Sequence, residues 1–149
     1  MATLKTIEAG DSRPPLNSCS AGSLVAVPVR FDIAADNNQT PIATGDILEL
    51  ASLPRGHVLV DCMVDSDAIA GATVDIGYTA ATGGTGQEIA TGMSLATAAL
   101  QRADEPGMTR QPVNDDNHQV IAMTFTAGSA AVAGVIHATL MYRASHFDI

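Results

Sequence analysis

The chain has 149 residues, of which 46% are hydrophobic, 3% aromatic and 15% charged, and its 7 basic and 16 acidic side chains give a net charge of −9. This length suits one domain, because two would each lie near the smallest size that buries a core. The charged fraction is well below the roughly 25% of ordinary soluble domains, so the composition indicates a surface that partly contacts other protein. The acidic excess argues against nucleic acid and against an anionic membrane as partners.

The sequence contains no recognisable membrane span or secretory signal. Its longest apolar stretch, 127–140, is interrupted by two glycines and His137 and is shorter than the ~20 residues of a spanning helix. The first residues lead into acidic ones without a hydrophobic segment. We therefore expect a cytosolic protein, in which Cys19 and Cys62 are buried thiols rather than a disulfide.

Residues 1–22 differ from the rest of the chain. They are polar, contain Arg13-Pro14-Pro15 and show neither a helical nor a strand period. Proline fixes its own φ and biases the preceding residue toward extended structure, so no helix is expected here. Two interpretations stay open, a frayed terminus or an extended arm that becomes ordered on a partner. Residues 23–149 are expected to form a single domain.

Between residues 24 and 33, hydrophobic residues occupy every second position, which is typical of a strand that buries one face. The expected inward residues are Val25, Val27, Val29, Phe31 and Ile33. Pro28 has no backbone N–H to donate, so this strand is expected at a sheet edge or with a bulge.

Further strands are expected at 47–51, 58–65, 73–78, 119–126 and 133–143. The expected inward residues of two of them are Val58, Val60, Cys62 and Val64, and Ile121, Met123 and Phe125. Residues 88–101 are ambiguous, because their hydrophobic residues have helical spacing but the run is short, and 104–117 is typical of a surface loop. The last strand is apolar on both faces, so we expect it to be central or covered by a neighbouring subunit, with Leu140 and Tyr142 at that interface.

Short strands separated by glycine and proline turns, with at most one short helix, predict an all-β fold. The expected architecture is an antiparallel β-sandwich or jelly-roll-like barrel that carries an extended N-terminal arm. Only two tyrosines and three phenylalanines are aromatic. Because aliphatic side chains then build the core, burial per chain is limited and oligomerisation would add to it.

No motif of catalytic, metal or cofactor chemistry stands above background. Ser94 lies in Gly-Met-Ser-Leu-Ala, which lacks the second glycine and the strand–turn–helix context of a nucleophile elbow. The glycines at 83–86 lack the Lys-Ser/Thr that binds a nucleotide phosphate. No zinc spacing joins the histidines, which are His57, His118, His137 and His146. No calcium-loop pattern joins the densest carboxylates, which are Asp61, Asp65, Asp67 and Asp75. We expect no enzyme, no metal and no cofactor.

Three segments resemble small decoration, or cement, proteins of tailed-bacteriophage heads. They are EAGDSRPPLNSCSAGSLVAV at 8–27, TGDILELASLPRGHVLVDCMVDSD at 44–67, and the closing strand that ends in Leu-Met-Tyr-Arg-Ala at 140–144. The resemblance covers the two ends and the first half of the chain, whereas 85–118 matches poorly. It is a pattern of the whole chain rather than a catalytic signature.

The resemblance implies a small β-rich protein on the outer surface of a capsid, made in the host cytoplasm and located in the virion. It implies a trimer more than a dimer, which staples major capsid subunits against internal DNA pressure. We expect the capsid contact in the arm, at Arg13, Pro14, Pro15 and Leu16, since an extended segment can add a strand to a sheet edge. The alternative is a carbohydrate- or receptor-binding β-sandwich of a phage fibre or adhesin, although the sequence offers few aromatic side chains for a sugar.

Overall fold

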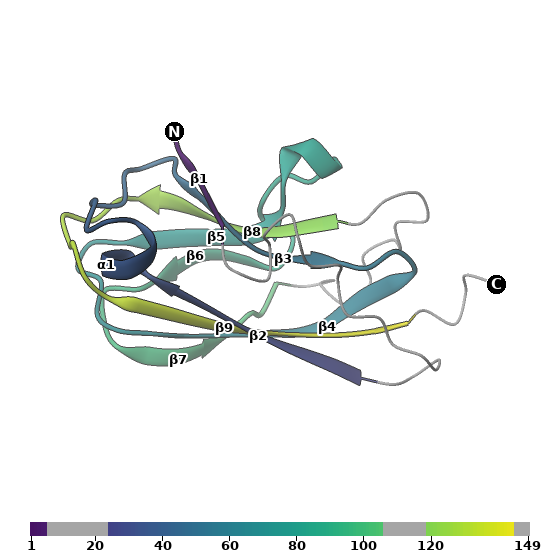
Figure 1. Ribbon diagram of the computed structural model, residues 1–149. Coiled ribbons are helices and arrows are strands. Elements are labelled where there is room, and N and C mark those ends of the chain that lie inside the picture. Colours follow the sequence, from purple (N-terminus) through teal and green to yellow (C-terminus); the bar gives the residue numbers. More distant parts are fainter. Residues whose placement is uncertain (6–23, 106–118, 145–149) are drawn as a thin grey trace.

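The computed structural model describes residues 1–5, 24–105 and 119–144. Two β-sheets pack face to face (Figure 1), which confirms the all-β, mainly antiparallel sandwich. The five-stranded sheet has the order β1 (Thr3–Lys5), β3 (Ile47–Leu53), β8 (Gln119–Ala127), β5 (Thr73–Tyr78) and β6 (Ala90–Ser94). The four-stranded sheet has the order β2 (Leu24–Asp32), β9 (Val135–Ala144), β4 (His57–Ser66) and β7 (Ala99–Arg102).

The helical structure of the described residues is short, as the sequence predicted. It consists of α1 (Ile33–Asp36) and one 3₁₀ turn (Ala80–Thr82). The Asp32 carboxylate caps α1 by accepting hydrogen bonds from the N–H groups of Ala34 at 3.0 Å and Ala35 at 3.3 Å. This cap ends the strand one residue before the buried Ile33, which was expected to continue it. None of the helices among these residues is long and apolar enough to cross a membrane.

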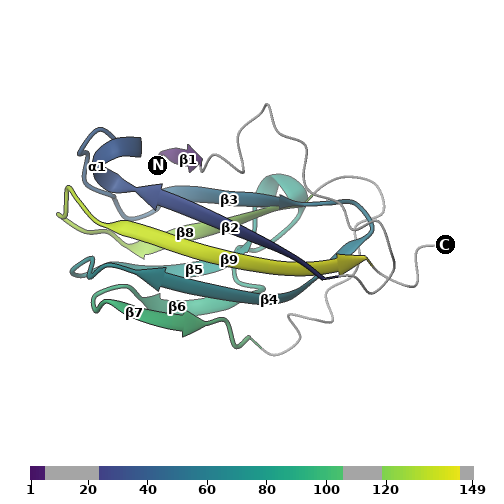
Figure 2. The ribbon, with the colours of Figure 1, turned by 60° about the horizontal axis from the view of Figure 1, so that its bottom comes forward.

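The core lies between the two sheets. In β2 and β8 it contains the side chains that the alternating pattern predicted to point inward. Val27, Val29 and Phe31 are 2–5% exposed, and Ile121, Met123 and Phe125 are 0–1% exposed. β2 is an edge strand, which confirms the position predicted from its central proline. β9 lies between β2 and β4 (Figure 2), which confirms that this strand, apolar on both faces, is central in its sheet.

The expected inward face of β4 is wrong for half of the strand. The register with β9 shifts between Leu59 and Asp61, which marks a bulge at Val60. Because a bulge adds one residue, the alternation changes phase there. Leu59 is 0% exposed and Val60 only half-buried, whereas Cys62 and Val64 point inward as predicted.

The ambiguous segment 88–101 forms no helix. It contributes β6 to the five-stranded sheet and β7 to the four-stranded sheet, and the buried Leu95 lies at the crossing. Backbone bonds from Leu95 N–H to Ala72 O at 3.0 Å and from Ile69 N–H to Leu95 O at 2.8 Å fix this crossing. The tertiary pairing of both strands outweighs the helical preference of an alanine-rich run.

Candidate functional site

Ser94 and His57, which were considered above for nucleophile and zinc chemistry, lie in different sheets. Ser94 is exposed at the end of β6, and its Oγ accepts a hydrogen bond from Ala96 N–H at 3.3 Å. His57 lies in the other sheet, 6% exposed, where its Nδ1 contacts Arg55 O at 2.9 Å and its ring meets Tyr142 edge to face at 5.5 Å between ring centres. Within 1–5, 24–105 and 119–144, no group of three His, Cys, Asp or Glu side chains could hold a metal. His118 and His146 lie outside the described residues.

The first residues form a strand that no periodic pattern in the sequence predicts. Thr3–Lys5 pairs in parallel with β3 at the edge of the five-stranded sheet. The buried Asp46 holds this end of the chain, because its Oδ1 accepts from Ala2 N–H at 2.8 Å and its Oδ2 from Ala43 N–H at 2.9 Å. Ile47 N–H donates to Ala2 O at 2.9 Å. Backbone pairing at a sheet edge needs no side-chain period, which is why the sequence pattern missed β1.

The consequence of β1 concerns the predicted arm. Residues 6–23 connect Lys5 in one sheet to Leu24 in the other, so this segment is joined to the sandwich at both ends. The expected contact residues Arg13, Pro14, Pro15 and Leu16 all lie within it, outside the described residues, as does Cys19.

The four-stranded sheet presents an outer face, toward the viewer in Figure 2, that no other described strand or helix covers. We call it the neutral face. The described residues that point outward on it are Leu24, Ala26, Pro28, Arg30, Asp32, Val58, Asp61, Met63, Asp65, Leu100, Arg102, Val135, His137, Thr139, Met141 and Arg143. Leu140 and Tyr142 point the other way, into the chain's own core, where they are 0% and 1% exposed. A subunit contact on β9 would therefore use the side chains that point outward, such as His137, Thr139 and Met141.

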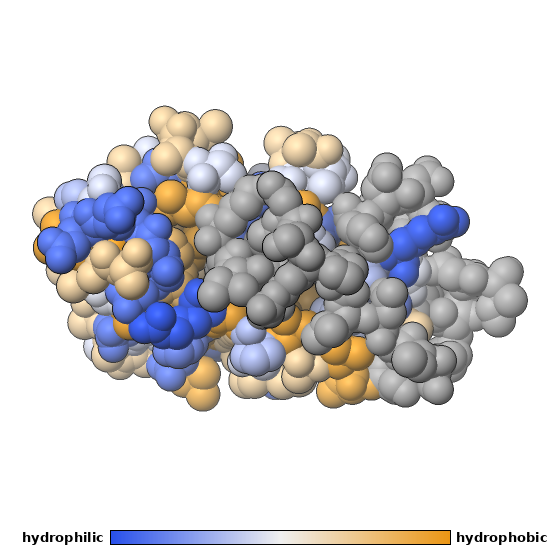
Figure 3. Space-filling model, in the orientation of Figure 1, coloured by the Kyte–Doolittle hydropathy of each residue, from blue (hydrophilic) through white to orange (hydrophobic). Residues whose placement is uncertain are grey.

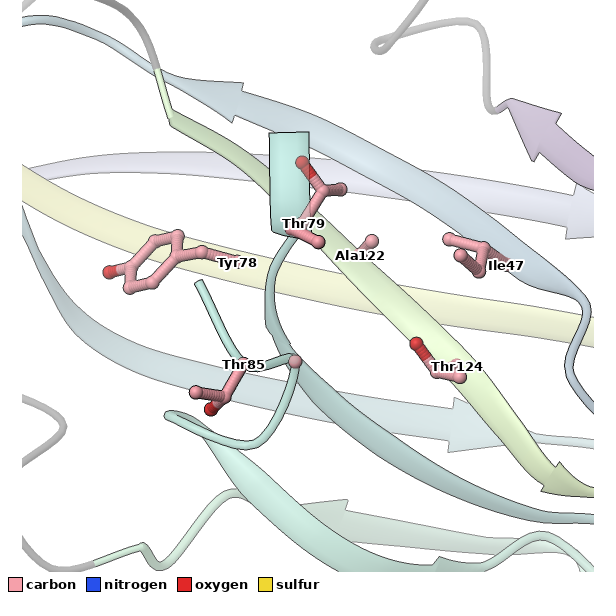
Figure 4. A pocket seen from close by; sticks show the side chains of 8 residues that line it. Ile47, Tyr78, Thr79, Thr85, Ala122 and Thr124 are labelled. Atoms are coloured by element: carbon pink, nitrogen blue, oxygen red, sulfur yellow. The ribbon is translucent and has the colours of Figure 1, made fainter. Parts of the chain in front are cut away.

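A pocket of about 150 Å³ lies on the outside of the five-stranded sheet. It is lined by Ile47, Tyr78, Thr79, Ala80, Thr85, Gly86, Ala122 and Thr124. Figure 4 shows Thr85, in the loop after β5, and Ile47, on β3, on opposite sides of Ala122 and Thr124. No charged residue lines the pocket, so it suits a small apolar group rather than an ion.

Glu88 holds the loop that forms one wall of this pocket. Its carboxylate accepts hydrogen bonds from Tyr78 N–H at 3.0 Å, Thr85 N–H at 2.5 Å and Thr85 Oγ at 3.0 Å. Burial acts to raise the pKa of Glu88. Hydrogen bonds to its carboxylate outweigh this effect and lower the pKa; they come from the backbone N–H groups of Thr85, Tyr78 and Glu88 and from the Thr85 hydroxyl. Asp75 acts similarly next to it, accepting from Gln87 Nε2 and Gly92 N–H, each at 2.7 Å.

We expect Glu88→Gln to lower the free energy of unfolding by about 1 kcal/mol at neutral pH, because the amide cannot accept all the bonds of the carboxylate. The pKa of Glu88 is lower in the folded state than its ordinary value of 4.5. The ionised carboxylate therefore stabilises the fold above pH 4.5, and this stabilisation is lost as the pH falls through the lowered pKa. The difference between variant and parent should therefore shrink as the pH falls below 4.5. Urea titrations across this range measure it, with Asp104→Asn as an exposed control. A difference that stays constant with pH would contradict the assignment.

Two other titratable groups in the core are held neutral. Burial, with a smaller contribution from the Asp61 carboxylate, raises the pKa of the free Cys62 thiol to about 12. Burial, with a smaller contribution from Glu88, raises the pKa of Tyr78 to about 12. Cys62 is thus the buried thiol that the sequence predicted. The aromatic side chains of the described part, Phe31, Tyr78, Phe125 and Tyr142, are all at most 4% exposed, so none offers a stacking face to a sugar.

The described residues form a small β-sandwich with an uncovered outer face on its four-stranded sheet and an uncharged pocket on the other sheet. No family model and no curated protein matches the sequence. Among solved structures, a chain of the Ralstonia phage GP4 capsid has a TM-score of 0.77 and 26% identity, covering 97% of this chain and 99% of that one.

Two more distant likenesses concern the fold alone. A chain of the cyanophage Pam1 capsid has a TM-score of 0.67 and 12% identity, with 91% and 95% of the two chains covered. A chain of the acid-stable capsid of Helicobacter pylori bacteriophage KHP30 has a TM-score of 0.51 and 13% identity, with 83% and 94% covered. The likeness to the GP4 chain supports a structural, capsid-related phage protein.

Proposed function

We propose that this protein is a decoration protein of a phage virion, which binds the outer surface of the capsid and holds neighbouring major capsid subunits together against internal DNA pressure. The observation that carries this proposal is the end-to-end likeness to a chain of the GP4 capsid, at 26% identity. The resemblance of residues 8–27 and 44–67 to decoration proteins supports the finer role. The protein would be made in the cytoplasm of the bacterial host.

The capsid contact in this proposal is the segment 6–23, with Arg13, Pro14, Pro15 and Leu16 at its centre. β1 and β2 attach both ends of this segment to the sandwich, and a loop tethered at both ends loses less entropy on binding than a free terminus does. An extended segment can pair with a sheet edge of the capsid through backbone hydrogen bonds. Where copies associate with one another on the shell, modest individual contacts add up to a strong attachment. This role needs no catalytic residue.

The test exchanges the contact residues while leaving β1 and β2 intact. We expect the combined variant Arg13→Ala, Pro14→Ala, Pro15→Ala and Leu16→Ala to bind at least about tenfold more weakly to capsids that lack the protein. Co-sedimentation with such capsids measures binding, and heating the coated capsids measures stabilisation. Deleting residues 2–22 is less informative, because it would also remove β1 from the sheet.

The matched control is Asn17→Ala with Ser18→Ala, which changes the same segment beside the proposed contact. We expect this control to coat capsids as the parent does. If the variant with all four substitutions at 13–16 also coats and stabilises capsids normally, this segment is not the capsid contact. If the unaltered protein does not bind capsids at all, the decoration role itself is wrong.

A further inference from the structure

We propose that the neutral face binds a second copy of this chain in a two-fold, face-to-face contact. The centre of the face is largely apolar, since Ala26, Pro28, Met63 and Met141 point outward around Thr139 from three adjacent strands. Leu24 and Leu100 flank this centre on the outer strands and are 55% and 68% exposed. Figure 3 shows hydrophobic and hydrophilic residues side by side along its lower margin, where this sheet lies. Such a mixed surface resembles protein contacts more than a solvated sheet.

Charge favours a second copy over other occupants of this face. Three arginines, Arg30, Arg102 and Arg143, balance three aspartates, Asp32, Asp61 and Asp65, so the face is formally neutral. Two ion pairs lie on it, Arg30 with Asp32 at 2.8 Å and Arg102 with Asp61 at 2.9 Å. The rest of the described chain has eight acidic and two basic residues. Copies of a chain with net charge −9 repel one another at any acidic face, and the neutral face avoids this repulsion.

The strand order makes the face complementary to itself. His137 on β9 pairs in register with Arg30 on one side and with Asp65 on the other. β9 and β4 are the two inner strands, so a two-fold axis parallel to them and between them places β9 over β4 of the partner. His137 then lies over Asp65 of the other copy, and Asp65 over its His137. One patch that meets itself closes a dimer, whereas a three-fold ring needs two different patches.

The size of the face is sufficient for such a contact. At about 4.8 Å between strands and about 3.4 Å per residue, the four strands provide roughly 500 Å² of flat sheet. The relief of the side chains increases the accessible area toward the ~800 Å² that each partner buries in a standard interface. Sheets that pack face to face in this way are the usual architecture of a β-sandwich core.

The test places a charge at the centre of the face and the same charge on the opposite side of the molecule. Thr139 is half-buried on β9, and Thr126 is exposed on β8 in the other sheet. We expect the unaltered protein to sediment at twice the 15.3 kDa of one chain. We expect Thr139→Glu to raise the concentration for half-association at least about tenfold, because an unpaired carboxylate would be buried in the contact. Thr126→Glu should associate as the parent does.

Sedimentation equilibrium over a range of concentrations measures these masses, and thermal melting confirms that both variants are folded. A monomeric parent, a parent of three times the chain mass, or equal effects of the two variants would each overturn the proposal. Capsid binding is measured separately with the variants at 13–16, so failure of one proposal is distinguishable from failure of the other.

Discussion

Replacing Phe125 by alanine is expected to lower the free energy of unfolding by about 3–5 kcal/mol, the range for truncating a buried phenylalanine. Phe125 is 0% exposed and belongs to the core between the two sheets. Its backbone N–H also donates to Asp46 O, and its carbonyl accepts from Gly45 N–H, at 2.9 and 2.8 Å. With 3% aromatic residues in the chain, each buried ring carries an unusually large share of the packing. The loss is comparable to the whole stability of a marginal domain.

Urea unfolding at neutral pH measures this loss, and Met123→Leu is the matched control. Met123 is equally buried on the same face of β8, and the exchange conserves volume, so it should cost less than about 1.5 kcal/mol. Comparable losses from the two variants would mean that the core adapts freely and that Phe125 is not specifically packed.

The alternation of β2 and β8 was predictable from the sequence because both strands bury one face and expose the other. The bulge in β4 was not, because Val60 is as apolar as its neighbours and nothing local marks an extra residue. β6 and β7 are stabilised by partners distant in sequence, so the helical spacing of an alanine-rich segment was misleading. β1 depends on backbone pairing and on the Asp46 carboxylate, which leave no periodic signal.

The residues expected at a subunit interface differ from those on the face that we propose as the self-contact. Leu140 and Tyr142 were chosen because β9 is apolar on both faces, but they are the residues that the core already buries. For the self-contact that we propose, the relevant signal is the other phase of the same strand, His137, Thr139 and Met141. Its meaning depended on the strand order, because the balance of arginine and aspartate appears only when β2, β4, β7 and β9 are placed side by side.

A single added methyl group at Gly77 is expected to lower the free energy of unfolding by about 3 kcal/mol, the upper part of the range for overpacking. Gly77 lies in β5 beneath the loop that follows it. A Cβ atom there would come within 2.2 Å of the Glu88 carboxylate, 2.4 Å of Gly86 C and 2.5 Å of Gln87 N. The carboxylate could move, but the two backbone atoms can retreat only if the whole loop lifts from the sheet. Lifting it would break the hydrogen bonds that Glu88 accepts from Tyr78 and Thr85.

Gly83→Ala, in the same loop, separates this steric effect from backbone strain. Gly83 has φ of 84°, and nothing lies within 4 Å of a Cβ placed on it. Alanine there should lower the free energy of unfolding by about 1–2 kcal/mol, the cost of a left-handed backbone conformation for a residue with a side chain. Urea unfolding gives the two free energies, and near-ultraviolet circular dichroism reports on the environment of Tyr78. We expect only Gly77→Ala to change that spectrum, because the loop packs directly on Tyr78, where Gly84 would place a Cβ 2.4 Å from its carbonyl oxygen. Equal costs for the two alanines, with unchanged spectra, would show that the loop is not held against the sheet as tightly as these distances require.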